Sequence, residues 1–466
     1  TCVECRRCTD SCPAAMAGGN GLDPRGFILA GRKALLEGRP GDPVIGNVLS
    51  ETALGACVTC GACQAACPVG IEHLDVLVGA KRAQALATGQ GVVAGGLFRS
   101  IEVHGNALSR PRHERKALLS DLGIPKFTGA DDQWLLWLGC VWGFNRGQRD
   151  AVAAFQQVLE TAGVDFGVLE DEPCCGHHSR RQGEESQFQD LARQSIETLK
   201  DNGVRRVVTP CPHCLHTLRR DYADLDGDLS LEVVHHSELL ARLIRDRALP
   251  LDGQAAATEA TFHDPCYLAR FESISEAPRE VLAAAGVALR ELPHRRERTL
   301  CCGGGAAGFV REQRVDRARR AEISASGASM LVTACPECRM MLDATIEQTR
   351  DIAEVVARSI RRARPLKPMG KKGETMFIHI PETADLEARI LEMFAQHPGE
   401  ELQLLDIATK AHISGKVSDL KHVAEHLAET GALRLVHRDG GSFYQLVRRE
   451  SAVAERPEEV AEVVVG

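Results

Sequence analysis

The stretch LCCGGG at residues 300–305 places two adjacent cysteines directly before three glycines. A second stretch, PCCGHH at residues 173–178, repeats the cysteine pair and the first glycine. A disulfide between neighbouring cysteines is strained, and the pair is an awkward set of ligands for one small ion. Glycines let the backbone take unusual dihedral angles and approach another group closely. The two stretches therefore indicate a larger inorganic group that accepts neighbouring sulfurs.

Each cysteine pair belongs to a longer repeat. A lone cysteine precedes the pair by 34 positions in one copy and by 35 in the other, and a Cys-Pro-x-Cys motif follows. The flanking sequence repeats too, since RRVVTPCPHC at 205–214 corresponds to SMLVTACPEC at 329–338. The two five-cysteine sets are Cys140, Cys174, Cys175, Cys211 and Cys214, and Cys266, Cys301, Cys302, Cys335 and Cys338.

A different cysteine repeat occupies the N-terminal part of the chain. The pattern Cys-x2-Cys-x2-Cys-x3-Cys-Pro occurs at residues 2–13 and again at 57–68. In this bacterial ferredoxin pattern three thiolates bind one cluster and the fourth binds the other. Zinc is the alternative for such motifs, but two complete sets of soft thiolates favour iron–sulfur clusters. The predicted sets are Cys2, Cys5, Cys8 and Cys67 for one cubane [4Fe-4S] cluster, and Cys57, Cys60, Cys63 and Cys12 for the second.

These repeats use all eighteen cysteines of the chain. The chain also has no secretory signal, so metal or redox use is favoured over a disulfide framework. A tetrahedral zinc site or a cubane cluster takes four thiolates, whereas each of the later sets has five. The surplus thiolate indicates a cluster opened out from the cube, in which one sulfur bridges two irons.

The pattern of a lone cysteine, Cys-Cys-Gly and Cys-Pro-x-Cys, present twice, resembles the cysteine-rich CCG domains of heterodisulfide reductase. Preceded by a two-cluster ferredoxin domain, it resembles the D subunit of that enzyme, or its C and B subunits fused. The same architecture is found in the C subunit of glycerol-3-phosphate dehydrogenase, in the iron–sulfur subunits of glycolate and lactate oxidases, and in DsrK-like subunits. The resemblance covers about residues 1–360.

The resemblance implies a noncubane [4Fe-4S] cluster in each five-cysteine set, besides the two cubane clusters. Two such clusters facing each other split a disulfide in this family, with one electron passing to each half. The candidate catalytic region then comprises the pairs Cys174-Cys175 and Cys301-Cys302, and the residues expected beside the clusters are Gly176, Gly303 and Gly304.

Two phrases resemble a different branch of the same family. These are GIEHLDVLVGAKR at 70–82 and FHDPCYLARFESISEAPREVL at 262–282. That branch exchanges electrons between flavoproteins and menaquinone, which implies a flavoprotein partner and a membrane cytochrome or quinone-linked subunit. The alternatives are therefore a disulfide reductase and an electron-transfer subunit, with a DNA-binding redox sensor as a third hypothesis.

Composition sets limits on these functions. The 466 residues suffice for two to four domains, and 44% hydrophobic with 26% charged residues is ordinary for a globular protein. A net charge of −8 does not favour direct nucleic-acid binding. No apolar run reaches the roughly 18 residues of a membrane span, so we expect a cytoplasmic protein that meets a membrane through a partner. Because Cys2 lies at the frayed end of the chain, we expect a trimmed N-terminus or a covering subunit.

The expected fold class is multidomain α+β. Helical patterns surround the first cysteine repeat, and short apolar strands alternate with helices in each CCG half, as in parallel α/β layers. Strands at 134–140 and 205–211 would place Cys140 and Cys211 at carboxyl ends, where open α/β sheets bind ligands. Three helical segments and a hairpin at 432–449 resemble a winged helix.

The sequence also suggests roles for the tryptophans and several histidines, and it suggests where the domains begin and end. We expect packing in the core for Trp134, Trp137 and Trp142. We expect a role behind the metal ligands or at the surface for His177, His178 and His213, since the thiolate sets are full. The predicted regions are a two-cluster domain at 1–104, a connector at 105–132, CCG domains at 133–250 and 251–360, a basic linker at 361–374, a winged-helix-like domain at 375–450 and a loosely ordered tail at 451–466.

Overall fold

The computed structural model describes most of the N-terminal four-fifths of the chain. The described residues are 2–18, 21–38, 45–46, 50–88, 96–251, 259–311 and 314–360, and the backbone of 433–438, 441–446 and 461–465. The chain separates into two compact units, Thr1–Arg364 and Pro365–Gly466. All eighteen cysteines lie in the first unit.

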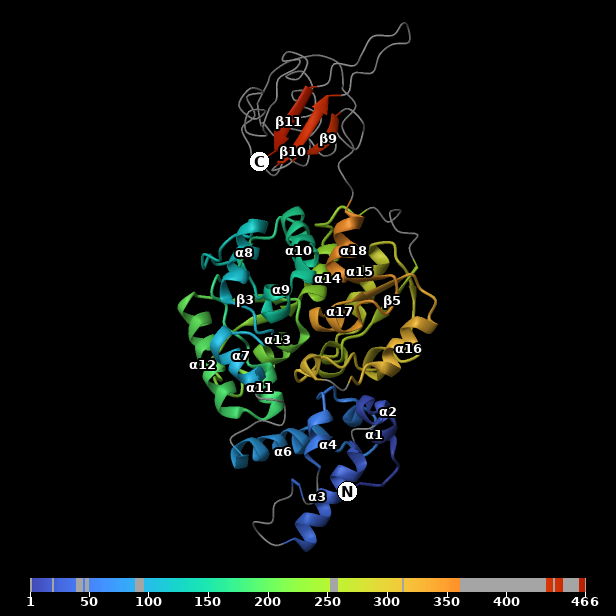
Figure 1. Ribbon diagram of the computed structural model, residues 1–466. Coiled ribbons are helices and arrows are strands. Elements are labelled where there is room, and N and C mark those ends of the chain that lie inside the picture. Colours follow the sequence, from blue (N-terminus) through green and yellow to red (C-terminus); the bar gives the residue numbers. More distant parts are fainter. Residues whose placement is uncertain are drawn as a thin grey trace. The chain divides into compact units, whose positions relative to one another are not determined.

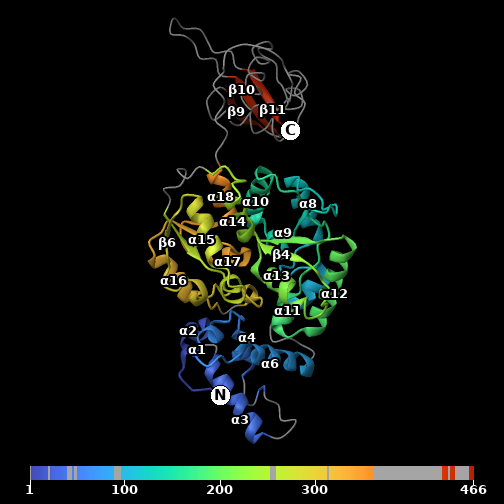
Figure 2. The same cartoon turned by 180° about the vertical axis from the view of Figure 1, so that it is seen from behind.

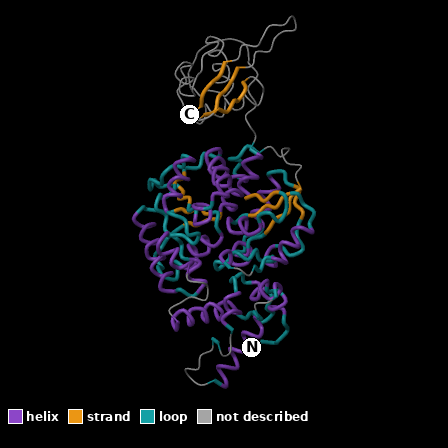
Figure 3. Tube along the Cα trace, in the orientation of Figure 1, coloured by secondary structure: helices purple, strands orange, loops and turns teal. Residues whose placement is uncertain are grey.

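The N-terminal part of the first unit is helical, as predicted (Figure 3). Proline at the first helical position starts α2 and α3, where its missing N–H costs nothing. Asp23 caps α3 by accepting a hydrogen bond from the Arg25 amide at 3.1 Å. The helices are α1 (Arg7–Asp10), α2 (Pro13–Ala17), α3 (Pro24–Glu37), α4 (Glu51–Ala56), α5 (Ala62–Ala65), α6 (His73–Thr88) and α7 (Gly96–His104).

Two four-stranded parallel sheets follow, one in each copy of the five-cysteine repeat. The first has the order β2-β1-β3-β4 and the second the order β6-β5-β7-β8, so both halves share one topology. We call residues 134–245 the first half and residues 259–359 the second half. The strands are β1 (Trp134–Leu136), β2 (Phe166–Gly167), β3 (Arg206–Thr209), β4 (Glu232–His235), β5 (Glu259–His263), β6 (Ala288–Arg290), β7 (Met330–Thr333) and β8 (Gln348–Asp351).

Helices and short helical turns connect these strands. The helices are α8 (Arg112–Leu122), α9 (Gly139–Phe144), α10 (Arg149–Thr161), α11 (His177–Gln182), α12 (Glu185–Asp201), α13 (Pro212–His216), α14 (His236–Arg245), α15 (Glu276–Ala284), α16 (Arg317–Ala325), α17 (Pro336–Leu342) and α18 (Ile352–Ser359). The turns are η1 (Arg146–Gln148), η4 (Arg296–Arg298) and η5 (Gly308–Val310), and the π-helical segments are η2 (Thr217–Asp221) and η3 (Tyr267–Phe271).

The central strands β3 and β7 carry the repeat that was visible in the sequence. Their residues RVVT and MLVT are almost entirely buried, as expected for strands covered on both faces. Each strand ends two residues before a cysteine, and a helix with proline at its first position follows. The predicted placement of Cys211 beyond a strand end is therefore confirmed, whereas β1 ends at Leu136, four residues before Cys140.

The two halves pack against each other with approximate twofold symmetry. Helix α10 contacts α18, and α14 contacts α15, so the helix before the second strand of each half meets the last helix of the other (Figure 1). The ring of His236 lies across this interface, with Nε2 3.1 Å from Oδ1 of Asp351, and both side chains are fully buried. One hydrophobic core runs through both halves and includes the three tryptophans, which confirms their predicted packing role.

Helices α1 to α6 gather at one end of the first unit, whereas α7 lies against the first half (Figures 1 and 2). Helix α6 contacts α11 of the first half, and α2 contacts α16 of the second half. The ammonium of the fully buried Lys81 donates to the Cys57 carbonyl at 2.9 Å and to Oε1 of Gln182 at 3.4 Å. The N-terminal helices therefore contact both sheet-containing halves.

One segment differs from the sequence prediction in this unit. The predicted connector at 105–132 contains the helix α8, which contacts α9. Leu119 and Arg115 form its buried face, and Gly123 ends it in the left-handed conformation. Polar residues dominate the segment, so the few buried positions gave too weak a hydrophobic period to reveal a helix.

The second unit contains a three-stranded antiparallel sheet in the order β11-β10-β9. Strands β9 (Leu433–Arg438) and β10 (Gly441–Leu446) form the hairpin predicted at 432–449. Strand β11 (Ala461–Val465) pairs with β10, so a loosely ordered tail was wrong for these five residues, whose valines favour a strand. The predicted linker and helical segments at 361–431 lie outside the described residues.

Candidate metal centres

The structure brings the five cysteines of the first set together. Cys140 lies in α9, and the pair Cys174-Cys175 occupies the loop before α11. Cys211 is the residue directly before α13, and Cys214 lies in the first turn of that helix. The sulfurs of Cys175 and Cys214 are 3.4 Å apart. The remaining thiols of the set are also close enough to interact, Cys140 with Cys174 and Cys211 with Cys214.

The second set repeats this arrangement. Cys266 directly precedes the π-helical segment η3, and Cys335 caps α17. The sulfurs of Cys302 and Cys338 are 3.2 Å apart, which corresponds to Cys175 and Cys214 in the first set. Cys301 interacts with Cys266, and Cys338 interacts with Cys335, so all five thiols are again connected. All five cysteines are buried.

Neighbouring thiols favour ionisation at equivalent positions. Hydrogen bonds from Cys174 and Cys214 lower the pKa of Cys175 to about 6. Cys301 and Cys338 likewise lower the pKa of Cys302, the corresponding residue of the second half. Because thiolates rather than thiols bind metals, these cysteines are suited to metal ligation.

Glycines leave room around the sulfurs. A Cβ atom on Gly139 would lie 3.1 Å from Sγ of Cys214, and the φ of +68° at Gly139 also favours glycine. Gly176 and Gly303 have φ values of +80° and +83° directly after the cysteine pairs. A Cβ atom on Gly304 would lie 3.0 Å from the Met341 side chain, so space is limited there as well. Gly139 was missed from the sequence, although it directly precedes Cys140.

The soft donor sets and this close backbone approach fit iron–sulfur clusters. In the N-terminal part, the thiols of Cys12, Cys57, Cys60 and Cys63 interact with one another electrostatically. Burial raises the pKa of Cys12 to about 12, with Cys60 and Cys57 adding to the shift. In the other predicted cubane set Cys8 interacts with Cys2, while Cys5 is exposed and Cys67 is half-buried.

The loop that carries Cys57 and Cys60 is held against the second half. The thiols of Cys60 and Cys301 lie in one buried cluster and are close enough to interact. Arg270 donates to the Cys60 carbonyl at 3.0 Å, and the hydroxyls of Thr59 and Tyr267 are 3.1 Å apart. The predicted second cubane site is therefore in direct contact with the second five-cysteine set.

Polar side chains fill the space between the two five-cysteine sets. Nε2 of His178 and Nδ1 of His213 lie 3.1 and 3.4 Å from the same Glu337 oxygen. Burial by itself raises the pKa of Glu337, but His213 and His178 outweigh it and hold the pKa at about 2. His177 packs against both His213 and Tyr267. All three histidines are buried, so the surface role considered for them is wrong.

Glu172 anchors the backbone that leads to Cys140. Its carboxylate accepts hydrogen bonds from the amides of Leu138 at 2.9 Å and Gly139 at 2.7 Å. Arg115, from the unpredicted helix α8, pairs with the same carboxylate at 3.0 Å, and both side chains are almost completely buried. Burial raises the pKa of Glu172 despite these partners. This anchor was not visible in the sequence, because 57 residues separate the paired side chains.

A cavity of about 480 Å³ opens beside the first set. Cys174 lines it together with residues of α7, α8 and α12, among them Glu102, Arg112 and Gln187. Its volume is in the range of small-molecule sites, roughly 300–1,000 Å³. No helix among the described residues is long and apolar enough to cross a membrane.

Comparison with protein families agrees with this arrangement. Residues 134–219 and 260–343 match the family described as cysteine-rich domain (CCG), and residues 1–71 match the 4Fe-4S dicluster domain. The fold and the cysteine sets thus define an iron–sulfur oxidoreductase in which a dicluster domain precedes two cysteine-rich domains.

The chain belongs to the family of the heterodisulfide reductase D subunit. It is 30% identical over 397 residues to the D subunit of the dihydromethanophenazine:CoB--CoM heterodisulfide reductase of Methanosarcina barkeri, covering 77% of this chain and 93% of that protein. It is 33% identical to a "Probable membrane-anchored ferredoxin" of Chromohalobacter salexigens, over 79% of this chain and 60% of that protein. It is 27% identical to the "EtfAB:quinone oxidoreductase" of Syntrophomonas wolfei, over 76% of this chain and 57% of that protein. The chain thus spans about three-fifths of the length of the latter two relatives.

Proposed function

We propose that this chain relays electrons through two cubane [4Fe-4S] clusters to two noncubane [4Fe-4S] clusters, where a disulfide is reduced. The observation that carries the proposal is the pair of complete five-cysteine sets, connected in the same way in both halves. The proposed cubane ligands are Cys2, Cys5, Cys8 and Cys67, and Cys57, Cys60, Cys63 and Cys12; the proposed noncubane ligands are Cys140, Cys174, Cys175, Cys211 and Cys214, and Cys266, Cys301, Cys302, Cys335 and Cys338.

The contact between Cys60 and Cys301 supports a direction for this relay. When bound, the clusters supply one-electron transfer steps. Arg270 and Tyr267 hold the Cys57–Cys60 loop against the second half, so the second cubane site lies beside the second five-cysteine set. Electrons from the N-terminal part would therefore reach the second set before the first.

Cleavage of a disulfide to two thiols consumes two electrons and two protons. His178 and His213 direct their ring nitrogens at one oxygen of the ionised Glu337 between the two sets. These imidazole rings would supply the two protons that turn the released thiolates into thiols. The cavity beside Cys174 supports access for a disulfide from the side of the first set. One electron from each set then balances the reaction.

Anaerobic purification with iron and acid-labile sulfide determination tests this assignment. Four clusters of four irons predict about 16 irons per chain. The double substitution Cys301→Ser/Cys302→Ser should remove about four irons and abolish thiol release from disulfides. About eight irons in the unaltered chain, with no loss in the double variant, would overturn the noncubane assignment.

A second function is electron transfer from a flavoprotein to quinone through a membrane partner. The names of two relatives, "EtfAB:quinone oxidoreductase" and "Probable membrane-anchored ferredoxin", favour it. It would place a cytoplasmic chain at the membrane through its partner. Parallel assays of thiol release and of menaquinone-analogue reduction, with the same reduced flavoprotein donor, separate the two functions. Quinone reduction without thiol release would replace the first proposal by the second.

For the second unit we propose a small winged-helix-like docking domain, at about residues 375–450. The β9–β10 hairpin supports this proposal. The net charge of −8 favours protein docking over DNA binding. A gel-shift experiment with the full chain tests the point, and salt-sensitive retention of duplex DNA would contradict the docking role.

A further inference from the structure

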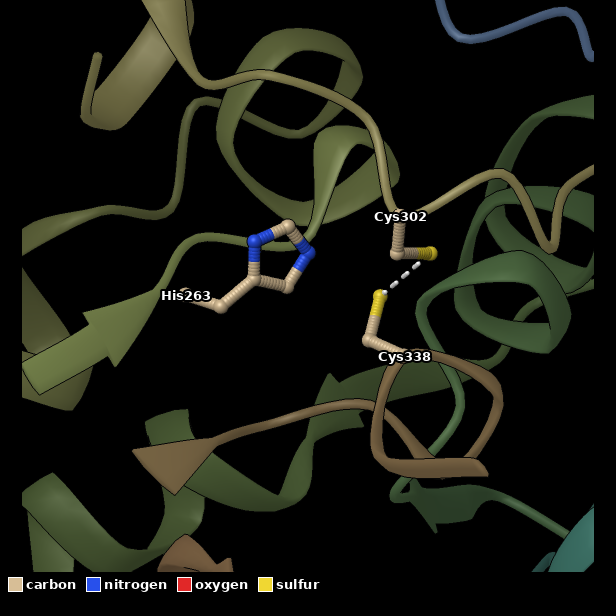
Figure 4. A group of neighbouring side chains, drawn as sticks. All are labelled: His263, Cys302 and Cys338. Carbon is tan, nitrogen blue, oxygen red and sulfur yellow. Dashed lines mark hydrogen bonds between the residues drawn. The ribbon is translucent and has the colours of Figure 1, made fainter. Parts of the chain in front are cut away.

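A buried histidine of the second half faces two cysteines of the second five-cysteine set. His263 is the last residue of β5, three positions before Cys266, and its side chain is completely buried. Figure 4 shows one ring nitrogen turned toward the sulfurs of Cys302 and Cys338 and the other turned away. A ring nitrogen of His263 and the two sulfurs all lie within 4.8 Å of one another.

Arg319 determines which ring nitrogen carries the proton. Its Nε donates to Nδ1 of His263 at 2.8 Å. A guanidinium only donates hydrogen bonds, so Nδ1 must accept through its lone pair and the ring proton must be on Nε2. In a doubly protonated ring, the N–H at Nδ1 would point directly at the N–H of Arg319. The imidazolium form is therefore excluded in this geometry.

The position of Arg319 is itself fixed. Its side chain is fully buried and pairs with Glu322 at 2.5 Å. It also donates to the His294 carbonyl at 2.8 Å. Both of these contacts use Nη1, while Nη2 donates to Oγ1 of Thr299 at 3.2 Å. Arg319 therefore has little freedom to turn Nε away from His263. The imidazole is therefore held in one tautomer and one orientation.

The nitrogen that faces the sulfurs carries a proton but completes no hydrogen bond. Nε2 of His263 is buried and has no partner at hydrogen-bond geometry among the described residues. The Cys302 thiol is nevertheless close enough to interact with the ring. A buried N–H without a partner is energetically costly, so its retention calls for an acceptor at this site. Thiolate sulfurs accept hydrogen bonds from such groups.

Two roles for His263 can be distinguished by this tautomer. A sixth ligand would need the Nε2 lone pair, hence a proton on Nδ1, where the Arg319 N–H already points. A hydrogen-bond donor needs the proton on Nε2, which is the tautomer that Arg319 enforces. The contact with Arg319 thus excludes His263 as a metal ligand and leaves it the role of hydrogen-bond donor.

We propose that His263 is a positioning residue whose Nε2–H donates to the thiolate sulfurs of Cys302 and Cys338, and so raises the reduction potential of the cluster that they hold. A hydrogen bond to a ligand sulfur stabilises the more negative reduced state. The inference rests on the proposed function, because it requires a cluster in the second five-cysteine set.

The first half also has a buried N–H group at the equivalent position of the sequence. Trp137 stands three positions before Cys140, as His263 does before Cys266. Its indole N–H is also buried without a partner among the described residues. Both halves therefore place a buried N–H donor at the same distance along the chain from the lone cysteine.

The test compares two conservative substitutions that separate the contacts of His263. In His263→Asn the amide oxygen replaces Nδ1 and accepts from Arg319, but no N–H reaches the sulfurs. In His263→Gln the amide nitrogen replaces Nε2 and still donates to them. We expect the midpoint potential of one cluster signal, followed by electron paramagnetic resonance in an anaerobic titration, to fall in the Asn variant. The Gln variant should stay close to the unaltered protein.

A tenfold change in the ratio of oxidised to reduced cluster at the original midpoint corresponds to about 59 mV for one electron. We expect a change of about this size in His263→Asn, with iron content unchanged. An equal potential in both variants and the unaltered protein, with all irons present, would overturn the inference. Loss of iron in His263→Asn, or strong nitrogen hyperfine coupling in the unaltered protein, would show a ligand instead. Failure of the unaltered protein to hold a cluster in the second set would refute the proposed function itself.

Discussion

The buried carboxylate of Glu172 offers a quantitative test of how the first cysteine set is held. Glu172→Ala removes the only carboxylate that accepts from the amides of Leu138 and Gly139 within the part of the chain that the structure describes. It also leaves the buried guanidinium of Arg115 without its charged partner. The backbone immediately before Cys140 should therefore lose its anchor.

The size of the effect follows from these contacts. A hydrogen bond to a charged group contributes about 1.5–3 kcal/mol, and about 1.4 kcal/mol corresponds to a factor of ten. The two amides should exchange their hydrogens roughly 10- to 100-fold faster. The unpaired Arg115 adds a wider loss of stability, about 3–5 kcal/mol for a broken buried pair. Solvent screening does not reduce this value much, because both side chains of the pair are almost completely buried.

Native-state hydrogen exchange measured by mass spectrometry on peptides covering 134–141 is the assay. Glu172→Gln keeps a single acceptor oxygen, so one of the two amides should remain protected. Glu170→Ala is the matched control, since Glu170 is two residues away and pairs with Lys116 and Lys126 at the surface. It should leave exchange at 134–141 unchanged. Unaltered exchange in Glu172→Ala would refute the anchoring role.

Three further predictions concern the interfaces of the first unit. Asp351→Ala should lower the free energy of unfolding by about 2–4 kcal/mol in anaerobic thermal unfolding, because it removes both the cap of α18 and the acceptor for His236. Asp351→Asn should lower it less, and equal losses in the two variants would contradict this reasoning. Gly61→Ala should lower the free energy of unfolding by about 1–2 kcal/mol, because φ is +74° there and the new Cβ would lie 2.9 Å from the Phe271 ring. Limited proteolysis should cut the 57–63 loop faster in this variant. Gly79→Ala serves as the control, because a Cβ at Gly79 would meet nothing within 4 Å. Removal of iron under anaerobic chelation should speed hydrogen exchange at 173–176 and 300–305 but not in β3 and β7, since the two loops would depend on the bound clusters. Equal loss of exchange protection in the loops and the strands would contradict this local stabilisation.

Much of the arrangement was predictable because its signals are local. The spacing of Cys211, Pro212 and Cys214 repeats at Cys335, Pro336 and Cys338, and in both copies a buried strand ends two residues earlier. Such patterns depend on a few neighbouring residues and on periodicity. The hairpin β9–β10 was predicted for the same reason, from a glycine-containing turn between two apolar strands.

The errors came from segments in which the local signal was weak or misleading. Helix α8 was missed because only Arg115 and Leu119 of its residues are buried, and an arginine does not register as a core residue. Strand β11 was missed because its short run of valines lies at the end of a charged tail. Both elements depend on contacts with residues far along the chain.

The sequence by itself determined the inventory of this protein: eighteen cysteines in two kinds of repeat, a helical dicluster region, and two halves with one topology. Only the tertiary structure decided how these parts meet. It joined Cys60 to Cys301, placed Glu337 between His178 and His213, and turned the imidazole of His263 toward Cys302 by means of Arg319. The physical reason is that spacing and hydrophobic period are properties of the local chain, whereas the direction of a buried side chain is set by packing against distant segments.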